Sequence, residues 1–337
     1  MPTIRVLVAA AAAVTASPAA ADTRVAFALD WKFEAPSAPY FLALDKGYYQ
    51  EEGLDVSIDS GSGSTQTIPR IAAGNYDLGF GDINSLIKFK DQNPDASVIA
   101  VMMTYETPPF AIVSLAGRGI DAGDPASLEG RTLGAPPPDA AFAQWPIFVE
   151  VNDLDTSTIT IESVGFPVRE PMLAAGDVDG IFGYSFSSVQ NLKLNDVPDD
   201  DIVVMLMADH GLALYGNAVL ANTDFAAENP GAVEGFIRAT IKGWRDTVAD
   251  PEAAIPHVLE RNDVARAEVE LDRLRMVLED NVLTPVVAEH GIGGVDMDRL
   301  ARSIDQIAVA YEYTAKPSAE EIFTDAYLPP PDARQID

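Results

Sequence analysis

An aromatic and an acidic side chain follow the first apolar run of the sequence at a spacing that suits recognition of a flat, polar molecule. Trp31 comes directly after residues 25–29, which we predict to form a buried strand, and Glu34 lies three residues further on. A large ring in a loop at a strand end needs a packing partner, and a flat ligand supplies one. An aromatic lid over the protein's own core would satisfy the ring equally well.

One short pattern occurs twice, and each copy leads into a loop with polar or aromatic side chains. Residues 72–81 and 174–183 both contain a helix end, a glycine, an aspartate and a short apolar run. Ligands of open α/β sheets bind at the carboxyl ends of strands, so we expect the two following loops to face one cleft. Asp82 is alternatively a helix N-cap. The candidate ligand-binding residues in these loops are Asp82, Asn84, Tyr184, Ser185 and Phe186.

A loop of glycine and serine is a further candidate for contact with polar ligand atoms. It spans residues 61–65, includes Ser64 and Thr65, and opens a predicted helix. Backbone N–H groups at the start of a helix bind anions and other acceptors. The alternative is a flexible turn with a Ser or Thr cap.

Arg169 has two interpretations that the sequence leaves open. Its guanidinium could hold a carboxylate, sulfonate or nitrate group of a ligand. It could equally pair with the neighbouring Glu170 or with an aspartate and hold the fold together. Asp139 and Phe142, which follow a run of three prolines, are two further candidates for the site.

The composition excludes several functional classes. The chain of 337 residues has 52 acidic and 22 basic residues and a formal net charge of −30, which disfavours binding to nucleic acid or anionic lipid. It has no cysteine and only three scattered histidines, so we expect no disulfide, metal centre or cofactor. It also lacks the common nucleophile-elbow, phosphate-loop and zinc-protease motifs.

The N-terminus predicts export. Residues 1–21 contain Arg5, an apolar stretch and three alanines before Asp22, which is typical of a signal peptide cleaved after Ala21. An uncleaved helix or anchor is the alternative. No later run is long and apolar enough to span a bilayer, and the absence of cysteine favours a bacterial periplasm over a eukaryotic exterior.

The elements that must position these side chains follow an α/β pattern. Several apolar runs are rich in Val and Ile without alternation, as in sheets covered on both faces, and predicted helices that end at glycine separate them. We therefore expect α/β layers with mainly parallel sheets. The length favours two domains. The ten predicted strands are residues 25–29, 56–58, 78–80, 98–103, 111–115, 132–135, 159–164, 180–183, 203–207 and 218–221.

The segment Leu-Asp-Lys-Gly-Tyr-Tyr-Gln-Glu-Glu-Gly-Leu-Asp-Val at residues 44–56 resembles a motif of the periplasmic substrate-binding proteins of ABC importers. The branch is the NMT1/THI5-like group, which includes binding proteins for nitrate, sulfonates and thiamine pyrimidine precursors. Residues 72–82 and 172–179 are similar to two further motifs of this family. In order and spacing, the resemblance extends over about residues 24–330.

This resemblance implies a two-lobed type II periplasmic-binding-protein fold with a hinge of two crossovers. The crossovers are expected near residues 105–110 and 209–217. Lobe 1 would comprise residues 24–107 plus 214–337, and lobe 2 residues 108–213. Ligand binding would close the hinge, and an ABC permease with its ATPase would recognise the closed form.

The resemblance also bears on the ligand. The Leu-Asp-Trp at residues 29–31 is similar to the opening of thiamine-pyrimidine binders, where the Trp contacts a flat heterocycle. A histidine of that branch is replaced near Ser37, and its second-lobe loop reads differently from residue 184 onward. We therefore expect a monomer that binds a small, pyrimidine-like nitrogen heterocycle, with a sulfonate, taurine or nitrate as the alternative. An enzyme related to the pyrimidine synthases of this superfamily is disfavoured, since this chain has no cysteine.

Overall fold

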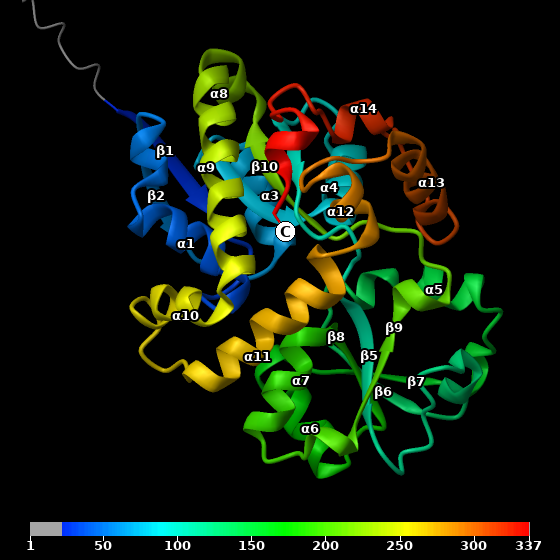
Figure 1. Cartoon of the computed structure of the whole chain (residues 1–337). Helices are drawn as coiled ribbons and strands as arrows, with labels where there is room; N and C mark the ends of the chain where they lie inside the picture. The colour runs from blue at the N-terminus through cyan, green and yellow to red at the C-terminus, as the bar shows by residue number, and fades with distance from the viewer. Residues whose placement is uncertain (1–21, 337) are drawn as a thin grey trace, which may run out of the picture.

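Two five-stranded sheets with the same strand order form the two halves of the molecule. The computed structural model describes residues 22–336. The first sheet has the order β2-β1-β3-β10-β4, and the second has the order β7-β6-β8-β5-β9. We call the halves built on them lobe 1 and lobe 2; Figure 1 shows lobe 1 above lobe 2. The repeated motif lies at β3 and β8, which hold the same central place in each sheet, so the expected two-lobed α/β architecture is confirmed.

All ten predicted strands are present, with ends shifted by at most two residues. Apolar runs bounded by Gly, Asp or Pro identify buried strands well, because such strands need little else to define them. The strands are β1 (Thr23–Ala28), β2 (Leu54–Asp59), β3 (Leu78–Asp82), β4 (Val98–Met103), β5 (Phe110–Leu115), β6 (Thr132–Ala135), β7 (Thr160–Ser163), β8 (Gly180–Tyr184), β9 (Ile202–Leu206) and β10 (Asn217–Asn222).

Four of the five strands in each sheet run in the same direction, as expected for mainly parallel sheets, and one strand in each sheet is antiparallel to them. In lobe 1, β10 pairs antiparallel with both β3 and β4, and in lobe 2, β5 pairs antiparallel with both β8 and β9. Both strands come directly after the chain has passed from the other lobe, so each enters its new sheet from the cleft side. The other pairs, such as β1 with β2 and β6 with β7, are parallel.

Helices cover the faces of both sheets, and several end at a left-handed glycine as predicted. Gly176 follows the helix predicted at residues 168–175 with φ of 87°, and Gly47, at 77°, divides the predicted helix 38–49 in two. The helices are α1 (Ala38–Asp45), α2 (Tyr48–Glu51), α3 (Ser64–Ala72), α4 (Ile83–Gln92), α5 (Trp145–Val151), α6 (Arg169–Ala175), α7 (Ser185–Leu194), α8 (Thr223–Glu228), α9 (Pro230–Ala249), α10 (Pro251–Leu259), α11 (Ala267–Val277), α12 (Pro285–His290), α13 (Met297–Ile307) and α14 (Ala319–Ile322).

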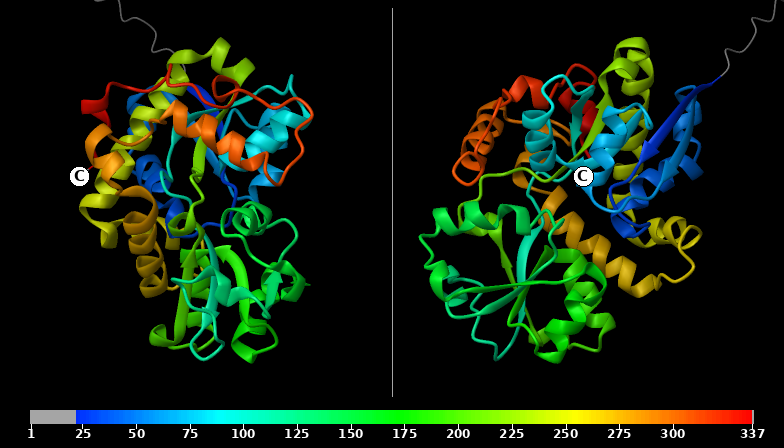
Figure 2. Two further views of the ribbon diagram at one scale, coloured as in Figure 1. Left: turned by 90° about the vertical axis from the view of Figure 1, so that its right-hand side faces the viewer. Right: turned by 180° about the vertical axis from the view of Figure 1, so that it is seen from behind.

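The helical last third of the chain packs mainly on lobe 1. Helix α9 buries Phe236 and Trp244 against α1 and the sheet, so Trp244 is a core residue as its helical stripe indicates. Helix α11 is different, because it contacts both η1 (Ala35–Ser37) of lobe 1 and α7 of lobe 2. In Figures 1 and 2 it runs beside the junction of the lobes.

The chain passes between the sheets twice, at residues 104–109 and 211–216, which join β4 to β5 and lead into β10. The predicted lobe limits, 107/108 and 213/214, fall inside these two crossovers. The predicted signal peptide lies outside the described residues. Among residues 22–336, no helix has the length and apolar character required to cross a membrane.

Candidate ligand-binding site

A cleft between the lobes collects side chains from the carboxyl ends of strands in both sheets. Its empty space, counted out to the open mouth and including solvent there, is about 830 Å³. Lobe 1 contributes Leu29, Asp30, Trp31, Lys32, Glu34, Pro36, Ser37, Tyr40, Gly63, Ser64, Thr65, Phe80, Ser85, Tyr105 and Asn217, and lobe 2 contributes Pro138, Asp139, Ala140, Phe166, Arg169, Tyr184, Phe186 and Ser187.

Asp30 presents one carboxylate oxygen to the cleft while the protein holds the other. The Ser64 hydroxyl donates to Asp30 Oδ2 over 2.7 Å, and the Asn217 side-chain amide donates to the same atom over 2.8 Å. Within the described part of the chain, Oδ1 accepts no hydrogen bond from another residue. Asp30 itself is only 8% exposed. It is therefore a fixed acceptor that lacks a donor.

The Gly-Ser loop positions Asp30 and Trp31 through its backbone. The amide of Gly61 donates to the carbonyl of Trp31 over 2.9 Å, and the amide of Gly63 donates to the carbonyl of Asp30 over 2.6 Å. A Cβ at Gly61 would lie 2.3 Å from the Leu29 carbonyl oxygen, so only glycine allows this approach. These two amides consequently serve the fold, while Ser64 and Thr65 reach the cleft.

Aromatic rings close the cleft from both sides. Trp31 of lobe 1 and Phe166 of lobe 2 meet edge to face with ring centroids 5.2 Å apart. Deeper in, Phe186 lies 5.7 Å from Tyr184 and 6.1 Å from Tyr105. Such rings supply flat apolar walls to a ligand with its own ring system.

Tyr184 also connects the lobes by a polar contact. Its hydroxyl, on the last residue of β8, donates to Asn217 Oδ1 over 3.0 Å. Asn217 begins β10 and orients Asp30, so the contact runs from lobe 2 through Asn217 to the acceptor of lobe 1. Burial raises the pKa of the Tyr184 hydroxyl well above its ordinary value, which keeps it a donor.

The guanidinium of Arg169 makes its ion pairs and hydrogen bonds with lobe 2. It contacts Asp139 at 2.9 Å and Glu170 at 2.6 Å, and it donates to the carbonyl of Phe182 at 2.9 Å. All three charged side chains are about 5% exposed or less. Of the two interpretations of Arg169, the geometry favours the pair that holds the fold.

A second buried arginine stands behind the lobe 1 wall. Arg273 of α11 lies 3.2 Å from Glu34 and 3.3 Å from Glu270, and it donates to the Ser187 hydroxyl of lobe 2 over 3.4 Å. Glu270 in turn accepts from the amide of Ala35 over 2.6 Å. Arg273 thus fixes the loop that carries Glu34, and it touches both lobes.

The electrostatics of the cleft favour an electron-poor or donor-rich ligand. Burial raises the pKa of the Asp30 carboxyl to about 6, against the hydrogen bonds from Ser64 and Asn217, which favour the charged form. Burial also raises the pKa of Glu34 and of Asp139, although an arginine lies beside each. A bound N–H donor or cation would compensate this desolvation.

Four of the predicted site residues do not line the cleft. Asp82 is fully buried and caps α4, accepting from the amides of Asn84 and Ser85. Asn84 donates to the Tyr215 carbonyl, and Phe142 packs on the core of lobe 2. Ser185, at the start of α7, is also buried. The other eight, Trp31, Glu34, Ser64, Thr65, Asp139, Arg169, Tyr184 and Phe186, do line it.

The cleft-lining residues that were not predicted from the sequence include Asp30, Phe166, Ser187 and Asn217. Asp30 shares with Asp82 a position at the end of a buried strand, and that position was an available signal. Phe166 and Asn217 reach the cleft only through the docking of the lobes, which no local pattern encodes. Among the described residues, no group of three or more potential metal ligands comes together.

The sequence model of the family described as NMT1/THI5 like matches residues 35–254. The chain belongs to the NMT1/THI5-like family. Similar members include the riboflavin-binding protein RibY of Chloroflexus aurantiacus, 25% identical over 95% of this chain and 91% of the relative. The formylaminopyrimidine-binding protein of Halalkalibacterium halodurans is 28% identical over 79% of this chain and 80% of its own.

Other proteins that are similar to this chain are named as enzymes. The 4-amino-5-hydroxymethyl-2-methylpyrimidine phosphate synthase of Aspergillus parasiticus is 25% identical over 72% of this chain and 71% of its own. Among solved structures, the periplasmic aliphatic sulphonate binding protein SsuA from Escherichia coli superposes with a TM-score of 0.71 at 14% identity, covering 91% of this chain and 99% of that one. The latter likeness establishes the two-lobed periplasmic-binding-protein fold.

Proposed function

We propose that this protein is the extracytoplasmic solute-binding component of an ABC importer, and that its solute is a small nitrogen heterocycle of the pyrimidine or flavin kind. The observation that carries the proposal is the unpaired Oδ1 of Asp30, held by Ser64 and Asn217 at the foot of an aromatic cleft. A ring N–H or an exocyclic amino group of the ligand supplies the donor that this oxygen lacks.

The two lobes have distinct roles in capture. The ligand ring lies against Trp31, and Asp30 accepts from its polar edge. Phe166 and Tyr184 of lobe 2 then cover the other side, so that the ligand stabilises the closed arrangement over the open one. The named binding proteins among the relatives, for riboflavin and for formylaminopyrimidine, are consistent with this ligand class.

The alternative of a sulfonate, taurine or nitrate ligand is less well supported. A strong oxyanion needs a cation with free donors, but Arg169 holds Asp139 and Glu170, and Arg273 is not among the cleft-lining residues. Lys32 is the remaining cation among the cleft-lining residues, and it is exposed beside Trp31. The cleft thus repels an anion more than it attracts one.

A binding role is also better supported than catalysis. The riboflavin- and formylaminopyrimidine-binding relatives cover more of this chain than the synthase relative does, and neither His nor Cys is among the cleft-lining residues. We further propose a periplasmic location, a signal peptide cleaved after Ala21, a monomeric state, and an ABC permease with its ATPase as partners. Gene neighbours that encode a permease and an ATPase would support this last assignment.

A thermal-shift screen of the chain from Asp22 tests the function. The ligands are 4-amino-5-hydroxymethyl-2-methylpyrimidine, formylaminopyrimidine, riboflavin, taurine, ethanesulfonate and nitrate. A ligand at about 100 times its Kd adds about 2.7 kcal/mol, which raises the melting temperature by a few degrees. We expect a heterocycle to do so. Stabilisation by the anions alone would contradict the ligand class, and mass spectrometry of the recovered ligand would reveal any turnover.

A further inference from the structure

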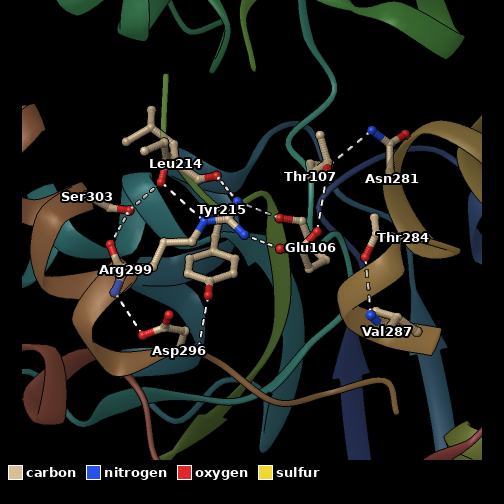
Figure 3. A network of polar contacts seen from close by, with 11 residues as sticks. Glu106, Thr107, Leu214, Tyr215, Asn281, Thr284, Val287, Asp296, Arg299 and Ser303 are labelled. Atoms are coloured by element: carbon tan, nitrogen blue, oxygen red, sulfur yellow. Dashed lines mark hydrogen bonds and ion pairs between the residues drawn. The ribbon is translucent and has the colours of Figure 1, made fainter. Parts of the chain in front are cut away.

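The guanidinium of Arg299 contacts both crossovers. Arg299 of α13 pairs with the carboxylate of Glu106 and donates to the Glu106 carbonyl over 3.0 Å, all within the first crossover. It also donates to the carbonyl of Leu214 over 2.8 Å in the second crossover. Its charge lies 3.9 Å from the ring centroid of Tyr215. Figure 3 shows Arg299 between the two segments.

Further side chains from the C-terminal helices fasten the crossovers to lobe 1. Asn281 donates to the Thr107 carbonyl over 3.1 Å and accepts from the Thr107 amide through its own carbonyl at 3.3 Å. Ser303 of α13 donates to the carbonyl of Ala213 over 2.9 Å. Several residues of the two crossovers are therefore hydrogen-bonded to the C-terminal helices of lobe 1. We expect the chain to bend outside the segments that these bonds hold.

In the first crossover, the hydrogen bonds that hold the backbone change from lobe 1 to lobe 2 within two residues. Thr107 is held by Asn281 of lobe 1, whereas the carbonyl of Pro109 accepts from the amide of Ser185 in lobe 2 over 2.9 Å. Pro108 stands between them. Neither proline has an N–H group, so no hydrogen bond from a proline amide opposes rotation there; because the rings fix φ, the rotation is that about ψ of Pro108.

In the second crossover, the change occurs across a single peptide bond. His210 is held by lobe 2, because its carbonyl accepts from Asn152 over 3.1 Å and its ring contacts the carbonyl of Ala122 at 2.8 Å. The carbonyl of the next residue, Gly211, accepts from Gln306 of α13 over 2.8 Å. Gly211 has a φ of +89°, a conformation in which glycine alone is unstrained.

We propose that Arg299 is a positioning residue that fastens both crossovers to lobe 1, so that the lobes rotate about Pro108 and the His210–Gly211 peptide. This inference deepens the proposed function and rests on it, since hinge rotation matters here for ligand capture. The axis divides the lobes three residues earlier in the second crossover than the predicted limit at 213/214.

The test measures the distance between the lobes by single-molecule energy transfer. Because the chain has no cysteine, S57C in β2 and S157C in the exposed loop before β7 give one label on each lobe. We compare the parent with Arg299→Lys, which keeps the charge but loses the planar fork. Arg302→Lys, exposed on the same helix, is the matched control.

In ligand-free protein, we expect Arg299→Lys to broaden the distance distribution and Arg302→Lys to leave it unchanged. Amide exchange at residues 105–107 and 213–216 should become about tenfold faster, because bonds to a charged group are lost. Should Arg299→Lys lower only the melting temperature and leave the distribution and the local exchange as in the parent, the proposal is overturned.

Two further variants keep the test decisive if Arg299→Lys folds poorly. Glu106→Gln removes the ionic partner in the first crossover only and should give a smaller broadening. Gly211→Ala should shift the mean distance away from that of the parent, since at a φ of +89° an alanine is strained and its Cβ would lie 2.6 Å from Val151 Cγ1 of lobe 2. These measurements need no ligand. If none of the solutes bound, the proposed function would be contradicted, but the assignment of the hinge would still be tested.

Discussion

The two walls of the cleft each contain a buried arginine between two carboxylates, yet the clusters differ in reach. Arg169 has all its contacts within lobe 2, at 2.6–2.9 Å to Asp139 and Glu170. Arg273 contacts the lobe 1 residue Glu34 at 3.2 Å and also Ser187 of lobe 2 at 3.4 Å. The buried charges of the lobe 2 wall are therefore paired within that lobe.

Lobe 1, in contrast, keeps its polar atoms available. Asp30 has an unpaired oxygen, and the ring of the half-buried Trp31 is in contact with Phe166 and Lys32. The difference indicates that ligand recognition belongs mainly to lobe 1, whereas the charges of lobe 2 mainly stabilise that lobe. Substitutions on the two sides should accordingly separate affinity from stability.

The largest expected effect is on the stability of lobe 2. Arg169→Ala leaves Asp139 and Glu170 buried without their cation, which typically costs about 3–5 kcal/mol. Urea unfolding at pH 7 measures this loss. Arg275→Ala, which removes an exposed ion pair with Glu252, is the control and should cost less than about 1 kcal/mol. Near-normal stability of Arg169→Ala combined with lost binding would instead make Arg169 a ligand contact.

The next effect is on affinity through lobe 1. Asp30→Asn keeps the shape but removes the charged acceptor, so we expect binding of the heterocycle found in the screen to weaken by about 1.5–3 kcal/mol. Isothermal titration calorimetry gives the value. Asp82→Asn serves as a control at a buried helix cap outside the cleft. Equal affinities for parent and Asp30→Asn would remove Asp30 from recognition.

Removing the aromatic wall of lobe 1 should cost slightly less. Trp31→Ala deletes a stacking surface worth about 1–3 kcal/mol. Phe166→Ala, on the lobe 2 side, should cost less affinity than Trp31→Ala if lobe 1 binds the ligand first. The same calorimetry compares both variants. A larger loss for Phe166→Ala would reverse the assignment of roles to the two lobes.

The smallest effect concerns pH. Because burial raises the pKa of Asp30 to about 6, its carboxylate is mostly protonated at pH 5 and ionised at pH 7. A neutral donor ligand should therefore bind about tenfold more weakly at pH 5 than at pH 7. Asp30 contributes to stability in the opposite sense: the raised folded-state pKa favours folding at low pH, and that contribution is lost as pH rises through about 6.

Comparison with Asp30→Asn isolates this carboxyl from Glu34 and Asp139, whose pKa values burial also raises. The variant should lose the pH dependence of binding between pH 5 and pH 7. It should also lose the part of the decline in unfolding free energy over this range that comes from Asp30. An unchanged pH profile in Asp30→Asn would assign the titration to one of the other two groups.

The fold could be predicted further than the site. Buried strands and glycine-capped helices are local features, so residues 98–103 and 132–135 were placed at their true ends. The direction of β5 and β10 depends on where the crossovers enter each sheet, and the sequence of a single strand does not indicate this entry point. The one antiparallel strand in each sheet was therefore not predicted.

For the site, sequence shows which residues stand at strand ends but not which of them are already satisfied. Asp30 and Asp82 both stand at the ends of buried strands. The carboxylate of Asp82 caps α4, whereas Asp30 has one carboxylate oxygen that accepts no hydrogen bond from another described residue. Similarly, Arg169 could be assigned only once Asp139, 30 residues away, was seen beside it. For both Asp30 and Arg169, contacts with residues distant in the sequence determine whether the side chain is available to a ligand.

The antiparallel strand β10 has a consequence for biosynthesis. Lobe 2 is contiguous from β5 to β9, but the lobe 1 sheet stays open between β3 and β4 until residues 217–222 have emerged. The inserted lobe can thus complete its sheet first, while the outer lobe waits with two unpaired strand edges. A chain interrupted before residue 217 would retain a finished lobe 2 beside an incomplete lobe 1, and those edges are where it would aggregate.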